Sequence, residues 1–175
     1  MAIVLDGTLG ITSVTGSSSL CVAGPAFSVG ANATSQGIPT GTTTVINLNS
    51  KTFDTNTCFN NTGSTTTLNG LSVPAYSFCP NVAGYYQING CIQGPSSSTG
   101  IIVAYLIKNG SIVNQGNFLN TTVSAQALVS SVIYLNGTGD YAQLGMFQNL
   151  GSTSTIATEN STTFIYMNGS MVRSA

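Results

Sequence analysis

Few residues in this chain could carry out acid–base, nucleophilic or metal chemistry. Its 175 residues include no histidine, and the only acidic side chains are Asp6, Asp54, Asp140 and Glu159. The absence of histidine excludes a Ser-His-Asp or Cys-His catalytic arrangement and a histidine-ligated zinc. The carboxylates are too scattered along the chain for an evident calcium site. The sequence therefore predicts a protein that is not an enzyme and that binds no metal or other cofactor.

The charged residues that could be claimed as catalytic have simpler interpretations. Asp140 follows a Gly-rich turn, and we interpret its carboxylate as an acceptor for backbone N–H groups of that turn. Lys108 stands beside Asn109-Gly110, which suits a solvated hairpin tip. Lys51 and Arg173 are expected to make polar contacts between subunits.

Four cysteines leave a choice between two disulfides and free thiols. They are Cys21, Cys58, Cys79 and Cys91, and no pair has the Cys-x-x-Cys spacing of zinc or redox sites. The N-terminus lacks the basic start and long apolar stretch of a signal peptide, so we expect the chain to fold where it is made. We therefore favour free, partly buried thiols over disulfides.

The composition is poor in charge and rich in small neutral residues. Lys and Arg together number 3 and the net charge is −1, whereas 24 Thr, 22 Ser and 17 Asn dominate the polar content. No basic patch exists for a nucleic acid, and no apolar run approaches the roughly 18–20 residues of a membrane span. Because surface charge normally keeps soluble monomers apart, we expect copies of the chain or a partner to cover much of its surface.

Short segments rich in Val, Ile, Thr, Tyr and Phe recur between clusters of Gly, Asn, Ser and Pro, which predicts an all-β domain. The Asn109-Gly110 pair predicts a tight two-residue hairpin. Residues 54–70 and 152–162 are expected to be exposed surface loops. The expected strands are 26–29, 43–48, 76–78, 84–92, 100–108, 111–119, 125–135, 141–147 and 163–172.

Three of these strands are apolar on both faces, within residues 101–107, 132–135 and 164–167. Only one face of a sheet meets the core of a sandwich, so the second face needs another cover. We favour a subunit interface, and the alternative is burial by loops of the same chain. The residues assigned to core or trimer contacts are Tyr86, Ile88, Ile102, Leu106, Ile133, Leu135, Phe164 and Tyr166.

A series of short motifs follows one order along the chain from Pro25 onward. The motifs are Pro25-Ala26-Phe27-Ser28, Phe53-Asp54, Gly84-Tyr85-Tyr86, Lys108-Asn109-Gly110 and Leu135-Asn136-Gly137-Thr138-Gly139-Asp140, with a looser match at Phe164 and Gly169. This order resembles the C1q-like domain, the trimeric jelly roll shared with the tumour necrosis factor family. The resemblance implies an all-β, homotrimeric jelly-roll sandwich over 25–175. The collagenous stalk and the acidic calcium-binding loops of the family are missing, so neither calcium nor immune recognition is carried over.

Residues 1–24 are expected to form an extended N-terminal arm containing one short apolar strand. Their beginning, MAIVLDGTLGITS, looks like the start of many bacteriophage tail-fibre and virion proteins. This likeness implies attachment to a viral shell or to a neighbouring subunit. The arm residues expected to make that attachment are Ile3, Val4, Leu5, Leu9 and Ile11.

Together these features favour a non-enzymatic virion protein, a trimeric decoration or cement protein that stabilises a phage head. Its partners would be its own copies and the major capsid protein or another virion protein, assembled in the host cytoplasm. The alternative is a tail-fibre or spike tip that binds a host cell-surface glycan. An extracellular ligand of the C1q or tumour necrosis factor type is disfavoured because the sequence shows no secretion signal.

Overall fold

The computed structural model describes residues 24–32, 35–94, 100–121, 126–156 and 164–175, together with the backbone of 4–6 and 10–12. Side chains of residues 119–121 are not part of this description. Every regular element in these ranges is a strand. The strands are β1 (Val4–Asp6), β2 (Gly10–Thr12), β3 (Ala26–Gly30), β4 (Gln36–Ile38), β5 (Thr44–Val45), β6 (Ser50–Asp54), β7 (Phe59–Asn60), β8 (Thr66–Leu68), β9 (Leu71–Val73), β10 (Ser77–Phe78), β11 (Gly84–Gln93), β12 (Gly100–Lys108), β13 (Ser111–Thr121), β14 (Gln126–Leu135), β15 (Ala142–Asn149), β16 (Ser154–Ile156) and β17 (Tyr166–Ser174).

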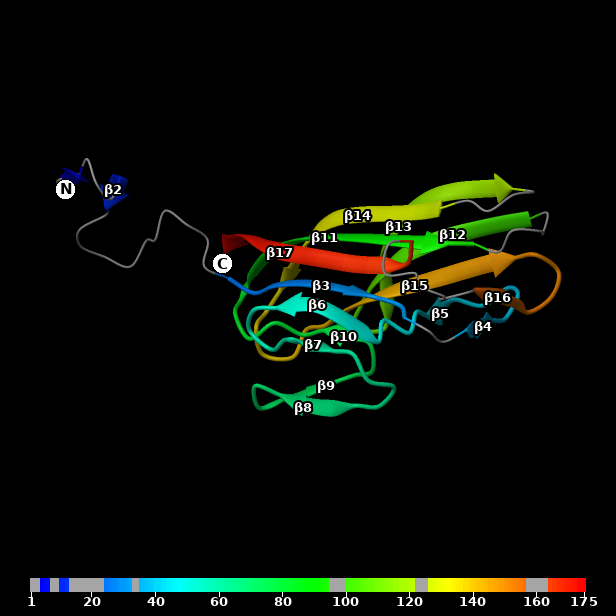
Figure 1. Ribbon diagram of the computed structural model, residues 1–175, viewed down its shortest axis with the longest axis horizontal. Coiled ribbons are helices and arrows are strands. Elements are labelled where there is room, and N and C mark those ends of the chain that lie inside the picture. The colour runs from blue at the N-terminus through cyan, green and yellow to red at the C-terminus, as the bar shows by residue number, and fades with distance from the viewer. Residues whose placement is uncertain are drawn as a thin grey trace.

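Two antiparallel sheets pack face to face as a sandwich (Figure 1). One is five-stranded, with the order β14-β11-β17-β3-β6. The other runs β13-β12-β15-β10-β7, and β5 also pairs with β15. Sequence neighbours such as β14 and β15 lie in different sheets, so the chain crosses repeatedly between the layers. This is the predicted jelly-roll arrangement of an all-β sandwich.

Aromatic residues from both sheets fill one end of the core. The Phe27 ring of β3 stacks on Phe78 of β10 at 4.2 Å between ring centroids and on Phe59 of β7 at 5.4 Å. Tyr86 of β11 meets Phe78 edge-on, and its hydroxyl donates to the Val82 carbonyl oxygen at 2.7 Å. A buried Tyr needs such a partner, because a lone hydroxyl in an apolar core is costly.

Most long strands lie where the sequence predicts them, and the two expected loops are partly wrong. Residues 54–70 contain β7, β8 and the turn into β9, and β8 pairs with β9 as a small hairpin that projects from the sandwich (Figure 1). Residues 154–156 form β16, which pairs with β4 and buries Ile156. Residues 157–163 lie outside the described ranges. The predicted strand at 43–48 shortens to β5, although Ile46 and Leu48 still enter the core.

On the outer face of β12, Val103 and Ile107 are buried within one protomer, which corrects the expectation of a subunit interface at these two positions. Val103 is fully buried and Ile107 is only 5% exposed. Ile107 fits because the neighbouring Gly145 has no side chain: a Cβ added there would lie 2.6 Å from Ile107 Cδ1. Val103 lies in register between Phe147 of β15 and Phe118 of β13. Val103 and Ile107 are thus buried by aromatic neighbours and by the space at Gly145, without a second subunit.

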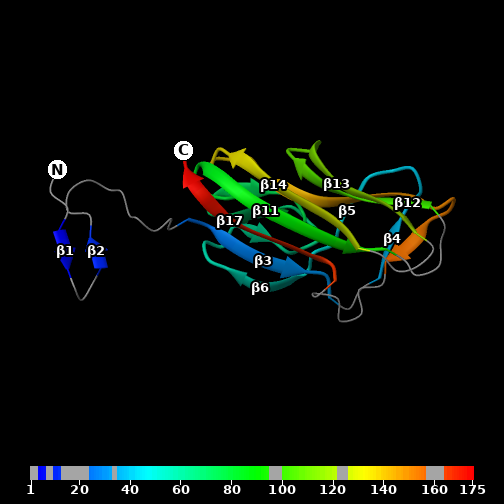
Figure 2. The ribbon, with the colours of Figure 1, turned by 90° about the horizontal axis from the view of Figure 1, so that it is seen from above.

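The backbone of the N-terminal segment forms a hairpin where an extended arm was expected. β1 pairs antiparallel with β2, with Val4 opposite Thr12 and Leu5 opposite Ile11 (Figure 2). Ile3 and Leu9, also predicted as attachment residues, lie outside the described residues. Across the described ranges, no helix has the length and apolar content that a membrane crossing requires.

Candidate functional site

The outer face of the five-stranded sheet carries an exposed row of apolar side chains, which we name the apolar strip: Tyr85, Leu128, Val132 and Tyr134. Leu128, Val132 and Tyr134 stand on β14 at 50%, 51% and 41% exposure. Side chains two residues apart on a strand share a face, so these three point outward while Leu135 points into the core. Tyr85 of β11 pairs in register with Tyr134, and their ring centroids lie 5.5 Å apart.

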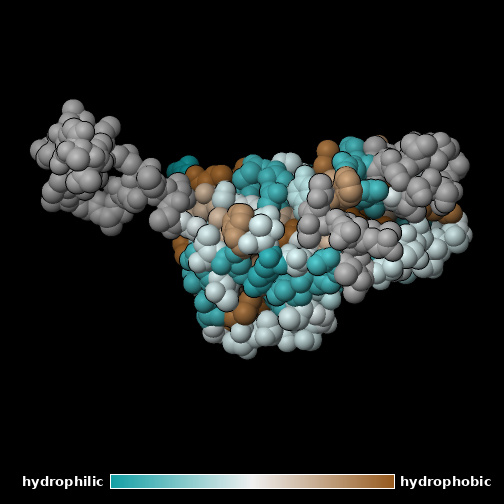
Figure 3. Space-filling model, viewed as in Figure 1, coloured by the Kyte–Doolittle hydropathy of each residue, from teal (hydrophilic) through white to brown (hydrophobic). Residues whose placement is uncertain are grey.

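The adjoining edge of the other sheet extends this surface. On β13, Phe118 is 60% exposed, and Ile112 and Val113 are also exposed. The backbone N–H of Leu128 donates to Asn117 Oδ1 at 2.6 Å, which links β14 to β13 across the rim of the sandwich. In Figure 3, hydrophobic residues interrupt the paler surface along the upper edge of the sandwich. Most of the exposed large hydrophobic side chains of the described chain therefore gather at one rim.

Neutral amide and hydroxyl side chains occupy the middle of the same face. Gln87 Nε2 donates to Ser130 Oγ at 2.9 Å and to Asn89 Oδ1 at 3.1 Å. Ser130 Oγ donates to Asn89 Oδ1 at 2.8 Å, and Asn89 Nδ2 donates to Asn168 Oδ1 at 3.1 Å. This amide network joins β14, β11 and β17 without any charged group. The face is therefore polar at its centre and apolar along β14, but nowhere ionic across these residues.

The charges that the structure describes are almost all paired inside the protomer. Lys51 Nζ lies 3.0 Å from Asp54 Oδ2, and Lys108 Nζ lies 2.8 Å from Asp140 Oδ2. Among the charged side chains of the described ranges, Arg173 alone lacks an ionic partner. Lys108 is therefore ion-paired within the chain and not a free side chain at a solvated hairpin tip. Lys51 also has a partner in its own chain, and its predicted contact with another subunit stays a prediction. Little net charge remains to oppose the approach of a second copy.

Asp140 anchors the turn before β15. Its Oδ2 accepts the Asn136 N–H at 3.2 Å, as predicted, and its Oδ1 accepts Asn109 Nδ2 at 2.7 Å. Burial raises the pKa of Asp140, but hydrogen bonds from Lys108 and Asn109, together with the Lys108 charge, outweigh burial and hold that pKa below its ordinary value of 3.8. Lys108 Nζ also donates to the Tyr134 carbonyl oxygen at 2.8 Å. These contacts hold the turn in place beside the apolar strip, and we name Lys108, Asn109, Asn136 and Asp140 the Asp140 cluster.

The described cysteines are buried free thiols. Cys58, Cys79 and Cys91 are each at most 1% exposed, while Cys21 lies outside the described residues. Burial raises the pKa of Cys79 to about 11, with further contributions from Cys58 and Asp140. Burial likewise raises the pKa of Cys58 and of Cys91. In the described part of the chain, no three His, Cys, Asp or Glu side chains gather as a metal site.

The residues predicted for core or trimer contacts take different positions. Five are less than 2% exposed and belong to the protomer core, so of the two predicted roles the structure gives them the first. Ile133 packs partly buried against that core, Tyr166 is half-buried and Phe164 is 44% exposed. The five core residues are Tyr86, Ile88, Ile102, Leu106 and Leu135.

The sequence predicts a second apolar face within 132–135, and Val132 and Tyr134 are exposed there, whereas the exposed Tyr85 and Leu128 were not predicted. The alternation of Leu128, Val132 and Tyr134 against Val129, Ile133 and Leu135 defines two apolar sets on one strand. Either set could have faced the core, because both consist of large apolar residues. The sequence therefore shows that β14 has two apolar faces, but it does not show which of them faces the core.

No family model and no curated protein sequence matches the chain. Solved structures do. Murine APRIL, crystallised at pH 5.0, superposes with a TM-score of 0.56 at 8% identity, covering 85% of this chain and 99% of that one. Its pH 8.5 structure gives a TM-score of 0.54 at 7% identity, covering 85% and 98%.

Eiger TNF from S. frugiperda superposes with a TM-score of 0.53 at 10% identity, covering 87% of this chain and 95% of that one. Identities this low carry the architecture and nothing further. The shared architecture spans the sandwich predicted from the motif order. The chain therefore has the C1q/TNF-like jelly-roll fold.

Proposed function

We propose that the chain is a non-enzymatic virion structural protein that assembles as a homotrimer and decorates or cements the head of a bacteriophage. The observation that carries this proposal is the exposed apolar strip on a protomer with almost no unpaired charge. A surface of this kind is stable in water when another protein surface covers it. The C1q/TNF-like fold supports three copies as the number that closes the contact.

The energetics favour self-association through the apolar strip. Burying a whole Val, Leu or aromatic side chain contributes about 1.5–3 kcal/mol, so half-exposed side chains each retain roughly half of that gain. Tyr85, Leu128, Val132 and Tyr134 supply that gain once per protomer. A closed ring repeats the contact at every interface, which opposes the entropic cost of association.

The N-terminal hairpin is the proposed attachment to the shell. β1 and β2 pair only with each other among the described strands, so their outer edges keep unpaired backbone N–H and C=O groups. An edge of this kind can extend a sheet of a neighbouring protein by main-chain hydrogen bonds. Ile3, Val4, Leu5, Leu9 and Ile11 would add apolar contacts to the major capsid protein or another virion protein. The likeness of residues 1–13 to the start of phage virion proteins supports this role.

Particles of the phage that encodes the chain provide the test. A cement protein is expected in hundreds of copies per particle, quantified on a stained gel against the major capsid protein, and to stay bound in molar NaCl. Salt resistance follows because screening weakens ionic contacts but not apolar ones. A few copies per particle would support the tail-fibre or spike tip alternative, and release by salt would contradict an apolar attachment.

A further inference from the structure

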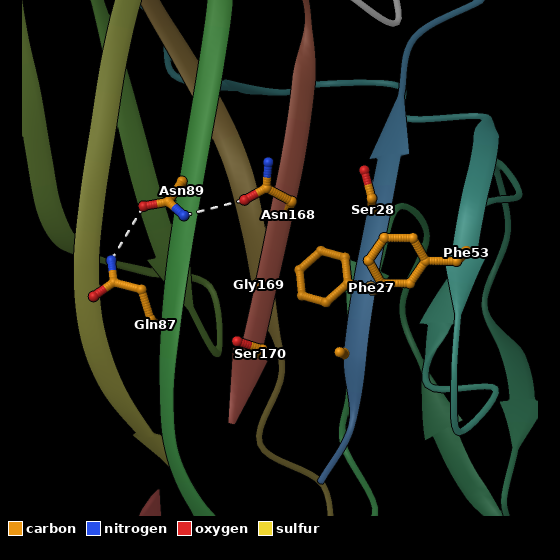
Figure 4. Close-up of a pocket in the computed structure, with 9 residues that line it drawn as sticks. Phe27, Ser28, Phe53, Gln87, Asn89, Asn168, Gly169 and Ser170 are labelled. Atoms are coloured by element: carbon orange, nitrogen blue, oxygen red, sulfur yellow. Dashed lines mark hydrogen bonds between the residues drawn. The ribbon is translucent and has the colours of Figure 1, made fainter. Parts of the chain in front are cut away.

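The same sheet face carries a second feature beside the apolar strip. A groove of about 280 Å³ runs over β11, β17, β3 and β6. We name it the Phe53 groove, and Figure 4 shows its lining. The side chains that matter are Phe53, Ser28, Gln87, Asn89, Asn168 and Ser170.

One wall of the groove is an aromatic ring with no structural duty in the core. Phe53 lies on β6 and is 48% exposed, and its register partner on β3 is Ser28. Figure 4 shows the ring extending from β6 over β3 toward β17. Single exposed aromatic side chains are common on protein surfaces, so the Phe53 ring indicates a ligand site only together with the polar groups opposite it. Its exposed face is available to a ligand.

The opposite wall offers polar atoms that the fold leaves unused. Gln87 and Asn168 each use one polar atom of the side-chain amide in the amide network: Gln87 Nε2 donates a hydrogen bond, and Asn168 Oδ1 accepts one. Within the described residues, Gln87 Oε1 and Asn168 Nδ2 have no hydrogen-bond partner, nor do the Ser28 and Ser170 hydroxyls. The network holds Gln87 and Asn168 in place, so a ligand would not need to order them.

The chemistry of the lining selects the class of ligand. No charged side chain lines the groove, and the two charged residues of β6, Lys51 and Asp54, are paired with each other. Amide and hydroxyl groups match sugar hydroxyls, which both donate and accept hydrogen bonds. The C–H groups of a sugar ring carry a slight positive charge and pack on the negative face of an aromatic ring. From this combination we propose that the Phe53 groove binds a neutral saccharide.

The size of the groove suits one or two sugar units. Small-molecule pockets typically enclose roughly 300–1,000 Å³, so 280 Å³ lies at the lower end. The groove extends from β11 toward β3 and β6, whereas the apolar strip lies on β14 and, through Tyr85, on β11. Gln87 of the groove pairs in register with Val132 of the apolar strip, so the groove borders the strip on that side. Phe53, Ser28 and Asn168 lie on strands that carry no residue of the strip, and the saccharide proposal therefore does not rest on the proposed virion role.

Saturation-transfer NMR on the full chain tests this proposal. The probes are lactose and the methyl glycosides of glucose, galactose, mannose and N-acetylglucosamine. We expect saturation transfer to at least one of them, reduced about tenfold in affinity by Phe53→Ala and retained by Phe53→Tyr. The matched control is Phe118→Ala, which removes another exposed phenyl ring, on β13, and should leave binding unchanged.

A second variant and hydroxyl-radical footprinting test the same proposal independently. Asn168→Ala removes the free amide N–H and should also weaken binding, with thermal unfolding of each variant confirming the fold. No transfer to any of these sugars at millimolar concentration, or equal loss with Phe118→Ala, would overturn the proposal. Protection of Phe53 from hydroxyl radicals in the sugar-free oligomer would also overturn it, because a second copy would then fill the groove.

Discussion

The outer faces of β12 and β14 are both apolar, yet one is covered and the other is exposed. On β12, Val103 and Ile107 are at most 5% exposed in the protomer alone. On β14, Leu128 and Val132 are half exposed. The strands differ in their neighbours. Gly145 gives Ile107 a space to occupy, whereas β14 pairs with β11 alone among the described strands and stands at the edge of the sheet.

This contrast shows that an apolar run does not by itself identify an interface. The outward side chains of Val103 and Ile107 on β12 are buried within their own chain, because Gly145 leaves space for Ile107 and aromatic residues flank Val103. The β14 run has no such cover among the described residues. An interface is therefore assigned by what remains exposed after folding, and the account predicts opposite outcomes for the same change on the two strands.

The largest expected effect comes from placing a carboxylate on each face. Ile107→Asp buries an unpaired charge and should lower the free energy of unfolding by about 4 kcal/mol or more. Val132→Asp meets water, so the protomer should stay folded, with a loss of about 1 kcal/mol or less, but should no longer associate. Urea denaturation and light scattering measure the two effects. An unfolded Val132→Asp protein would remove the distinction between the faces.

The next effect sharpens the explanation for β12. Gly145→Ala places a methyl group against Ile107 Cδ1 and should cost about 1–3 kcal/mol of folding free energy. Ile107→Val removes Cδ1, so in that background the cost should shrink in a double-mutant cycle. Gly37→Ala is the control, since its new Cβ would lie an ordinary 3.5 Å from Thr153 Cγ2. Strict additivity of Gly145→Ala and Ile107→Val would count against the proposed gap.

A smaller effect concerns the Asp140 cluster beside the apolar strip. Asp140→Asn removes the ion pair with Lys108 and should cost about 1–2 kcal/mol near pH 7. Because the folded pKa of Asp140 lies below 3.8, its contribution is present above that pH and disappears as the pH falls through the folded pKa. The two proteins should therefore converge in stability in strong acid. A constant difference across the whole pH range would rule out the ionic contribution.

The smallest effect leaves stability unchanged and tests the buried thiols. With a pKa of about 11, Cys79 is about one part in a thousand thiolate at pH 8, so it should react with Ellman's reagent far more slowly than an exposed thiol. The measurement uses Cys21→Ser, which leaves only Cys58, Cys79 and Cys91. Denaturation should expose all three at once. Rapid reaction in the folded protein would place these thiols outside the core.

Turn chemistry was readable from the sequence where it joined long strands. Asn109-Gly110 predicted a two-residue hairpin, and both residues have positive φ, 51° and 78°. Asn69-Gly70 has nearly the same angles, 50° and 77°, yet its hairpin was not predicted. The flanking β8 and β9 have three residues each, mostly Thr, Ser and Leu, and carry no apolar alternation that would mark them as strands.

The candidate sites were less predictable than the fold. The groove joins Phe53 to Asn168, which are far apart along the chain and meet only because β3 lies between β6 and β17. No spacing in the sequence encodes that meeting. The apolar strip depends on which of two equivalent sets on β14 faces inward, and the core settles that direction through Leu135. The low charge, in contrast, was visible from composition and led directly to the expectation of self-association.

The mass of the purified chain in solution at micromolar concentration, in low salt and in molar NaCl, shows directly whether the chain self-associates through apolar contacts. The account predicts three times the chain mass of 17.9 kDa in both, and a single chain mass for Val132→Asp. A wild-type protein that sediments as one chain at this concentration, with Leu128 and Val132 open to water, would contradict it.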